Sequence, residues 1–266
     1  MSAVRRWAVL ALLAAPGAWP AAPAEFQSVY AEPVAEEYRI YYEELAREHF
    51  LESVAQELNH VLVLSHPIRL AMAECGHSTT AWLAESRTVT VCYEFLDAVL
   101  VIAGDSAGTK ARAEQLFSGA VTFALLTEVG RALVEEYALP VQGDAFKAGD
   151  EFAAITLASA ERSGDPSAAA AIEFFAAALG KPDSGFEYLE THRFDRDRLE
   201  TVACILYGNA PANHAASIAH GIVPKSRAPH CAEEVVAVAS AWDRYLKSHT
   251  RSPSPATLAP AAAPHP

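Results

Sequence analysis

Apolar side chains recur every three to four positions along most of the chain, which is the spacing of amphipathic helices. Acidic residues separate the apolar and aromatic ones in the first such segment, and Pro140 stops the second. We predict helices over about 34–58, 109–139, 144–160, 166–179, 195–207 and 231–249. Two other apolar segments, 68–75 and 87–95, are short, and the second is rich in β-branched residues, so we predict strands joined by a polar loop. The expected fold is α+β and mostly α, a single domain with a small antiparallel strand pair.

The two ends of the chain differ from the part between them. Residues 1–24 combine a positively charged start, a short apolar run and small residues, the arrangement of a cleaved secretory signal peptide. The apolar run is short and interrupted by proline, so we expect no stable membrane anchor. Residues 251–266 are rich in proline and alanine, and we expect a disordered tail. Residues 25–250 then form the domain, which we expect to be secreted or periplasmic.

The composition argues against one class of partner. The 266 residues carry 20 Lys and Arg against 33 Asp and Glu, a formal charge of −13 at pH 7. Nucleic acids are bound by basic surfaces, so we expect no nucleic-acid partner. Hydrophobic residues make up 52% of the chain, more than a disordered acidic chain contains, and most of it should therefore fold.

Four cysteines lie in the expected domain: Cys75, Cys92, Cys204 and Cys231. An even number of cysteines in an exported protein indicates disulfides. Three pairings are open, and the short segments between neighbours favour Cys75–Cys92 and Cys204–Cys231. A zinc site is the alternative, but the chain has no C-x-x-C and the spacings do not suit a zinc ribbon.

One motif resembles the nucleophile turn of serine hydrolases. Residues 104–108, "GDSAG", match G-x-S-x-G and would expose Ser106 to a histidine. The chain before them begins with a long predicted helix and contains no oxyanion loop such as H-G-G-G. Gly, Ser and Asp in this arrangement ordinarily connect two helices. A serine hydrolase acting through Ser106 stays an alternative.

A second motif lies in the predicted helix over 109–139. In zincin metallopeptidases, H-E-x-x-H places two zinc-binding histidines on one helix face, together with a glutamate that activates the metal-bound water. The corresponding segment here is "TEVGR", with Glu128 at the position of the general base. Thr127 and Arg131 occupy the two histidine positions.

Several segments together resemble a family of bacterial exported "putative metallopeptidases". They are "ECGHSTTAWLAESRTVTVCYEF", "TEVGRALVEEYALPVQG", "AGDEFAAI", "THRFDRDRLETVACILYG" and "CAEEVVAVASAWDRYL", in this order over about residues 40–248. The resemblance implies a zincin-like fold and supports the two disulfide pairs named above. It also implies zinc as the cofactor of active relatives, with a third ligand at the position of Phe146 and a supporting aspartate at Asp150.

The ligands that the resemblance implies are missing from this sequence. Thr127 is a poor zinc ligand, Arg131 is a cation, and Phe146 has no lone pair to donate, so we expect no bound metal or other cofactor. Glu128 and Asp150 remain as vestigial motif residues. Because buried carboxylates need a compensating charge, we expect the guanidinium of Arg131 to stand in the place of zinc and neutralise Glu128, Asp150 or both. The alternative is that Arg131 points to solvent and pairs with a glutamate one turn later.

These observations predict an exported pseudoenzyme that binds a peptide or protein through the inherited cleft. The edge of the predicted strand "RTVTVCYEF" would pair with an extended partner. His192 matches a histidine in the family's pattern and would line the cleft. Three alternatives stay open: an active zinc peptidase with substitute ligands such as His192, a serine hydrolase, and a purely structural exported protein.

Overall fold

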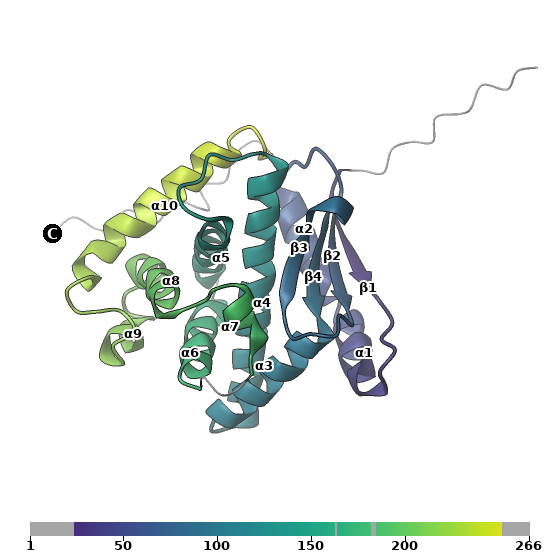
Figure 1. The fold of residues 1–266 in the computed structure, drawn as a ribbon. Coiled ribbons are helices and arrows are strands. Elements are labelled where there is room, and N and C mark those ends of the chain that lie inside the picture. The colour runs from purple at the N-terminus through teal and green to yellow at the C-terminus, as the bar shows by residue number, and fades with distance from the viewer. Residues whose placement is uncertain (1–23, 163, 182–184, 252–266) are drawn as a thin grey trace, which may run out of the picture.

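The computed structural model describes residues 24–162, 164–181 and 185–251. Its strands form a four-stranded mixed sheet on one side of a larger helical part (Figure 1). The strands are β1 (Phe26–Tyr30), β2 (Ile68–Ala73), β3 (Thr80–Leu83) and β4 (Thr88–Cys92), in the spatial order β1–β2–β4–β3. The predicted signal peptide and tail lie outside the described residues, apart from Ala24 and Arg251.

Both predicted strands are present, as β2 and β4, but the prediction that they pair antiparallel is wrong. They run parallel, with Ala73 opposite Cys92, and β4 pairs antiparallel with β3 instead. β3 occupies the predicted polar loop and reverses the chain, so β4 returns in the direction of β2. Four residues are too few for an alternating pattern to be recognised in the sequence.

The helices cover most of the remaining chain. They are α1 (Arg39–Arg47), α2 (Phe50–Val61), α3 (Tyr93–Ser106), α4 (Lys110–Glu136), α5 (Ala145–Glu161), α6 (Ser167–Leu179), α7 (Glu187–Thr191), α8 (Arg196–Asn209), α9 (Ala215–Ala219) and α10 (Cys231–Leu246). Short 3-10 turns lie at Glu36–Tyr38, Ala84–Ser86 and Ala228–His230. The predicted class, α+β and mostly α, is confirmed.

One predicted helix is broken into two. The segment 34–58 turns at His49, whose φ of 53° is left-handed, and α1 and α2 lie on either side of it. α1 buries none of its residues, whereas α2 buries Leu51, Ala55 and Leu58. The turn therefore lets α2 direct its apolar face at the core independently of α1. The other predicted helices correspond to α4, α5, α6, α8 and α10, with bounds shifted by a few residues.

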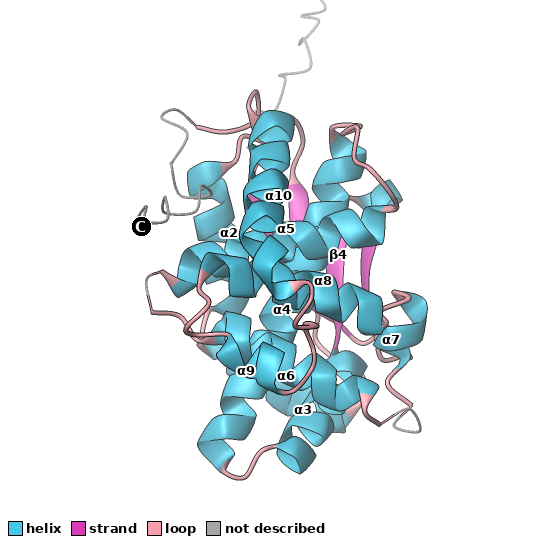
Figure 2. Ribbon diagram, turned by 90° about the vertical axis from the view of Figure 1, so that its left-hand side faces the viewer, coloured by secondary structure: helices cyan, strands magenta, loops and turns pink. Residues whose placement is uncertain are grey.

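α4 is the central helix of the core. It lies between the sheet and the layer that contains α5 and α6 (Figures 1 and 2). Its residues from Gly119 to Leu133 are buried almost without interruption. By length and composition α4 is apolar enough to cross a membrane, but 78% of its apolar window is buried inside this fold. Its apolarity is thus accounted for by the core that surrounds it.

Two disulfides tie the periphery to this core, and both have the predicted pairing. Cys75–Cys92 connects the chain just after β2 to the end of β4, with the two Cα atoms 5.5 Å apart. Cys204–Cys231 connects α8 to the first residue of α10, with the Cα atoms 5.0 Å apart. Disulfides are compatible with an extracellular or periplasmic location.

The crossing of α4 and α5 depends on two glycines. A Cβ atom added to Gly130 would lie 2.8 Å from Phe152 Cβ and 2.9 Å from Gly149 Cα. A Cβ atom added to Gly149 would collide with the Thr127 carbonyl and lie 3.0 Å from Arg131 Cγ. The two backbones can approach this closely only because neither glycine has a side chain.

We expect Gly149→Ala to destabilise the protein by about 1–3 kcal/mol, because the new methyl group would separate two helices that are packed backbone to backbone. Urea denaturation measures this change in the free energy of unfolding. Gly104→Ala is the matched control: this glycine also lies in a helix, α3, and nothing lies within 4 Å of an added Cβ. The control should be stabilised by about 0.5–1 kcal/mol. Equal effects of the two substitutions would contradict the packing argument.

Candidate functional site

The crossing of α4 and α5 brings together the positions that correspond to zinc ligands in the resembled family. Thr127 and Arg131 lie one turn apart on the face of α4 that contacts Gly149. Phe146 and Asp150 lie one turn apart on α5. Thr127 Oγ1 lies 3.4 Å from Asp150 Oδ1, and the Arg131 guanidinium lies 3.9 Å from the centre of the Phe146 ring. The predicted juxtaposition of these four side chains is therefore present.

Glu128 lies at the centre of this cluster and is completely buried. Its Oε2 accepts a hydrogen bond from Arg131 Nη1 at 2.6 Å, and its Oε1 accepts one from His192 Nε2 at 2.6 Å. Thr80 Oγ1, on β3, donates to Oε1 at 3.4 Å. Burial by itself would raise the pKa of Glu128, but the hydrogen bond from His192 and the charge of Arg131 lower it below its usual value. Glu128 is thus held as a carboxylate by groups of the chain itself.

Asp150 has a partner that sequence analysis missed. Arg198, on α8, donates from Nε to Asp150 Oδ2 at 2.6 Å. Arg198 also donates to the carbonyls of His192 and Phe146, so one guanidinium connects three segments. Burial raises the pKa of Asp150 to about 7, and the charge of Arg198 opposes that rise. In the sequence Arg198 lies in the segment "THRFDRDRLETVACILYG", but it is one of several charged residues near the start of a predicted helix, and the pattern did not single it out.

The two expectations for Arg131 can now be compared with its contacts. Its pairing with Glu128 is present, whereas Asp150 is paired with Arg198 instead. The alternative pairing with Glu135 does not occur, because Glu135 accepts a hydrogen bond from Trp82 Nε1 at 2.9 Å. The Arg131 side chain retains only 20% exposure, so it belongs to the cluster rather than to the solvated surface.

His192 lies in the cluster, where it is buried; we expected it from the family's pattern to line a cleft. Its ring is 1% exposed and stacks on Tyr188, with the ring centres 3.9 Å apart. Nδ1 lies 3.0 Å from Thr191 Oγ1 and 3.2 Å from the Tyr188 carbonyl, and Nε2 lies 2.6 Å from Glu128 Oε1. Tyr188 was not singled out in the sequence, because a buried tyrosine in a short helix carries no motif.

The cluster is closed rather than open. Phe146 packs its ring between Arg131 and the edge of His192, with the His192 and Phe146 ring centres 5.2 Å apart. Beneath it, Thr127 and Glu128 have no exposed surface and Asp150 retains 2%. A peptide bond would not reach Glu128 in this conformation.

The other candidate nucleophile lies in a different place. Ser106 is the last residue of α3, and its Oγ donates to the Ile102 carbonyl at 2.7 Å. No hydrogen bond between Ser106 and a histidine is present in the described part of the chain. "GDSAG" thus ends one helix and leads to the next, which is the ordinary use of these residues.

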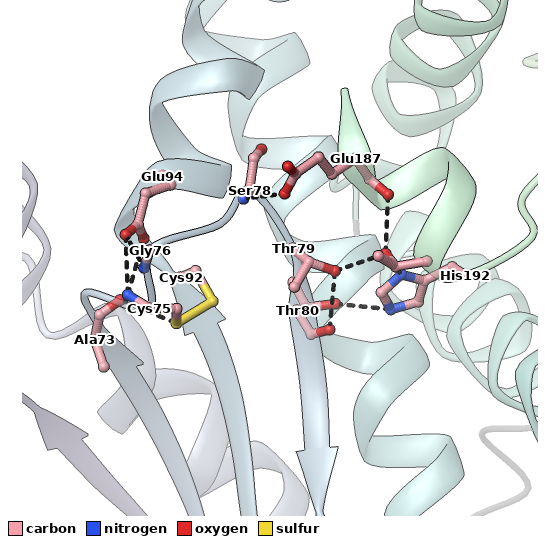
Figure 3. The surroundings of a disulfide bond; sticks show 11 residues. Ala73, Cys75, Gly76, Ser78, Thr79, Thr80, Cys92, Glu94, Glu187 and His192 are labelled. Atoms are coloured by element: carbon pink, nitrogen blue, oxygen red, sulfur yellow. Dashed lines mark hydrogen bonds between the residues drawn. A yellow bond between two sulfur atoms is a disulfide. The ribbon is translucent and has the colours of Figure 1, made fainter. Parts of the chain in front are cut away.

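Within the described residues, the carboxylates and histidines of the cluster do not form a group of three ligand atoms that all lie within 4.8 Å of one another. Among the residues that the structure describes, the group of His, Cys, Asp and Glu with three ligand atoms within 4.8 Å of one another is Cys75, Cys92 and Glu94. Both sulfurs of that group are in a disulfide. Glu94 accepts hydrogen bonds from the backbone N–H groups of Cys75 and Gly76, which fixes the loop before β3 (Figure 3).

That loop leads into β3, whose first residue lies beside the cluster. Figure 3 shows Thr79 and Thr80 pointing from the start of β3 toward His192. The Oγ1 atoms of Thr79 and Thr191 are 2.8 Å apart, and Thr80 Oγ1 lies 3.2 Å from His192 Nε2. β3 is the outer strand of the sheet on this side, so the cluster lies next to a sheet edge.

Comparison with known proteins agrees with the resemblance found in the sequence. A family described as "Putative metallopeptidase" matches residues 30–246, which is most of the chain. No significant match is found among curated proteins or solved structures.

The raised pKa of Asp150 predicts how stability depends on pH. The folded protein holds this proton up to about pH 7, whereas an unfolded aspartate releases it near its ordinary pKa of 3.8. The resulting stabilisation is complete below about pH 4 and is lost as pH rises through 7, by about 2–4 kcal/mol. Urea unfolding at a series of pH values should show this fall in the wild type and not in Asp150→Asn. A carboxyl signal of Asp150 that titrates below pH 5 in ¹³C NMR would contradict the prediction.

Proposed function

The chain belongs to the family described as "Putative metallopeptidase", and we propose that it is a zinc-free member that binds an extended peptide instead of hydrolysing it. One observation carries the proposal: Arg131, at a predicted ligand position, forms an ion pair with the predicted general base Glu128 at 2.6 Å. A guanidinium so placed supplies the positive charge that Glu128 requires.

The donor set does not fit zinc. The three predicted ligand positions hold a hydroxyl, a guanidinium and a phenyl ring, in Thr127, Arg131 and Phe146. Zinc sites in proteins are built from thiolate, imidazole and carboxylate ligands. The active-peptidase alternative requires substitute zinc ligands such as His192. That requirement finds no support, because His192 and Glu128 are paired with each other as buried side chains.

The surface that supports peptide binding is the edge of β3. We expected "RTVTVCYEF" to offer that edge, but this segment is β4, which has a strand on each side. Cys92 N–H donates to the Thr79 carbonyl at 3.2 Å, so residues 79, 81 and 83 direct their main-chain groups toward β4. The main-chain groups of Thr80 and Trp82 therefore face away from the sheet, and no described strand pairs with them. Both residues are buried in this conformation, with 2% and 9% exposure, and the Thr80 carbonyl accepts a hydrogen bond from Thr79 Oγ1 at 3.2 Å. The proposal therefore requires that an extended peptide hydrogen-bonds to this edge once it is uncovered.

Export is part of the same proposal. The two disulfides and the signal-like residues 1–24 both support a secreted or periplasmic protein. A purely structural exported protein is the second candidate, and it makes the opposite prediction for peptide binding.

We expect the purified protein to contain no stoichiometric zinc by elemental analysis. The combined variant Thr127→His, Arg131→His and Phe146→Glu should bind about one zinc per chain, because it supplies three ligands and removes the competing cation. Phe146→Glu alone is the control and should bind none. Stoichiometric zinc in the wild type that is lost in His192→Ala would instead favour the active peptidase, and hydrolysis of unfolded casein would establish it.

Peptide binding is tested with an acetylated Thr-Val hexapeptide and its N-methylated forms. Every second N–H group of an extended peptide points to the strand edge, and the others point away from it. Methylating the N–H groups that point to the edge should therefore abolish binding, and methylating the others should not. Isothermal titration calorimetry measures the dissociation constants. Binding that is insensitive to both patterns would exclude strand addition, and no binding at all would favour the structural alternative.

A further inference from the structure

The sheet has a second outer strand, β1, on the side away from β3 (Figure 1). The Glu25 carbonyl accepts a hydrogen bond from β2, and the Ala31 N–H donates one to β2. The odd-numbered residues of β1 therefore direct their main-chain groups at β2, and Phe26, Ser28 and Tyr30 direct theirs away from the sheet. Unlike the first residue of β3, Ser28 and Tyr30 are only half-buried.

Asn59, on α2, shows how this edge accepts a partner. Its Oδ1 accepts a hydrogen bond from the Phe26 N–H at 2.8 Å, and its Nδ2 donates to the Phe26 carbonyl at 2.9 Å. One side chain thus forms the two hydrogen bonds that a neighbouring strand would form. The outward main-chain groups of Ser28 and Tyr30 have no hydrogen-bond partner among the residues that the structure describes. An unpaired strand edge of this kind is a site for pairing with another extended chain.

An open hollow of about 820 Å³ lies along the same edge, between β1 and α2. Its walls are residues 25–28, the part of α2 from Glu52 to His60, and Arg251. The hollow therefore leaves space for an added main chain beside the outward groups of Ser28.

The described part of the chain ends at this hollow. Leu62 and Thr250 form an antiparallel bridge, so the chain there runs back toward the end of α2. Arg251 Nε then donates to the Asn59 carbonyl at 2.7 Å. Residues 252–266 follow in the sequence. Because an extended chain covers about 3.3 Å per residue, they are long enough to pass along the five residues of β1.

The sequence "PATLA", residues 255–259, offers the groups that this edge needs. In a parallel pair, the N–H and the carbonyl of one residue bond to two residues that are two positions apart on the partner strand. The Pro255 carbonyl and the Thr257 N–H would serve Ser28 in this way. The Thr257 carbonyl and the Ala259 N–H would serve Tyr30.

The prolines of this sequence fall where the edge needs no donor. In this register Pro255, which has no N–H, faces the Phe26 carbonyl, and that carbonyl already accepts a hydrogen bond from Asn59. Proline also favours an extended backbone in the residue before it, which applies to the residues before Pro253, Pro255 and Pro260. Strand addition uses main-chain groups, so it does not require an apolar face.

We propose that residues 255–259 of this chain add to β1 as a parallel strand and cover this edge of the sheet. The occupant is the chain's own C-terminal segment, because the chain arrives at the hollow through Arg251. Covering an outer strand prevents it from pairing with other molecules. The inference does not depend on a peptide at the edge of β3.

Hydrogen exchange of the β1 amides, measured by NMR, tests the proposal. The N–H groups of Ser28 and Tyr30 should exchange at least about tenfold more slowly in the full chain than in a chain that ends at Arg251, because each gains a hydrogen bond. The N–H groups of Gln27 and Val29 are internal controls, since they face β2 and should exchange slowly in both chains.

Two proline substitutions in the full chain test the register. Thr257→Pro removes an N–H that would donate to Ser28, and it should return the exchange of Ser28 and Tyr30 to the rates of the shortened chain. Ala256→Pro is the matched control, because it removes an N–H that points away from β1, and the slow exchange should persist.

Three outcomes would overturn the proposal. Equal exchange of Ser28 and Tyr30 in the full and shortened chains would show that residues 252–266 do not cover the edge. Equal effects of the two proline substitutions would exclude the proposed strand pairing. Slow exchange in the shortened chain that becomes fast on dilution would assign the edge to a second copy of the chain.

Discussion

The close crossing of α4 and α5 is the constraint on which the rest of the site depends. Gly130 and Gly149 let the two backbones touch, and the side chains that follow each glycine or lie three residues before it are then directed into the same small volume. Thr127 and Arg131 enter it from α4, and Phe146 and Asp150 enter it from α5. In a zincin such a crossing would bring ligands to a metal. Here the same crossing brings together a hydroxyl, a guanidinium, a ring and a carboxylate.

The buried carboxylates determine what else must be present. Glu128 and Asp150 have almost no exposed surface, and an uncompensated buried charge is strongly destabilising. Arg131 pairs with the first and Arg198 with the second. Two guanidiniums carry the same total charge as one zinc dication. The cluster can therefore dispense with a metal without leaving either carboxylate unpaired, provided that both arginines are in place.

The sequence predicts those parts of the site that are local along the chain. Arg131 is three residues from Glu128 on one helix, so helical geometry alone suggests their contact. Each disulfide closes a short segment, which favours its pairing, and the family resemblance supports the same pairing. The partners that were missed come from far away: both Arg198–Asp150 and Thr80–Glu128 join residues 48 positions apart. Such contacts depend on how α8 and β3 pack, which periodicity does not reveal.

The fold prediction succeeded where the pattern along the chain defines an element and failed where the backbone conformation or a distant partner defines it. Apolar spacing predicted the long helices, since each buries one face over many turns. It failed at His49, where one residue with φ of 53° redirects the chain without changing the apolar pattern on either side. It also failed at β3, because pairing with β4 rather than a pattern of its own defines that strand.

The two parts of the proposed function, a site without zinc and peptide binding at the edge of β3, depend on different atoms. Zinc sites are built from imidazole, thiolate and carboxylate ligands, which Thr127, Arg131 and Phe146 do not supply. Strand addition needs the outward main-chain groups of β3, whose direction is set by the pairing of β3 with β4 and which belong here to buried residues. Substitutions at the crossing of α4 and α5 therefore leave the edge intact as long as the cluster stays packed. Arg131 and Phe146 close the crossing, and His192, which packs against Phe146, contacts Thr80 at the start of β3.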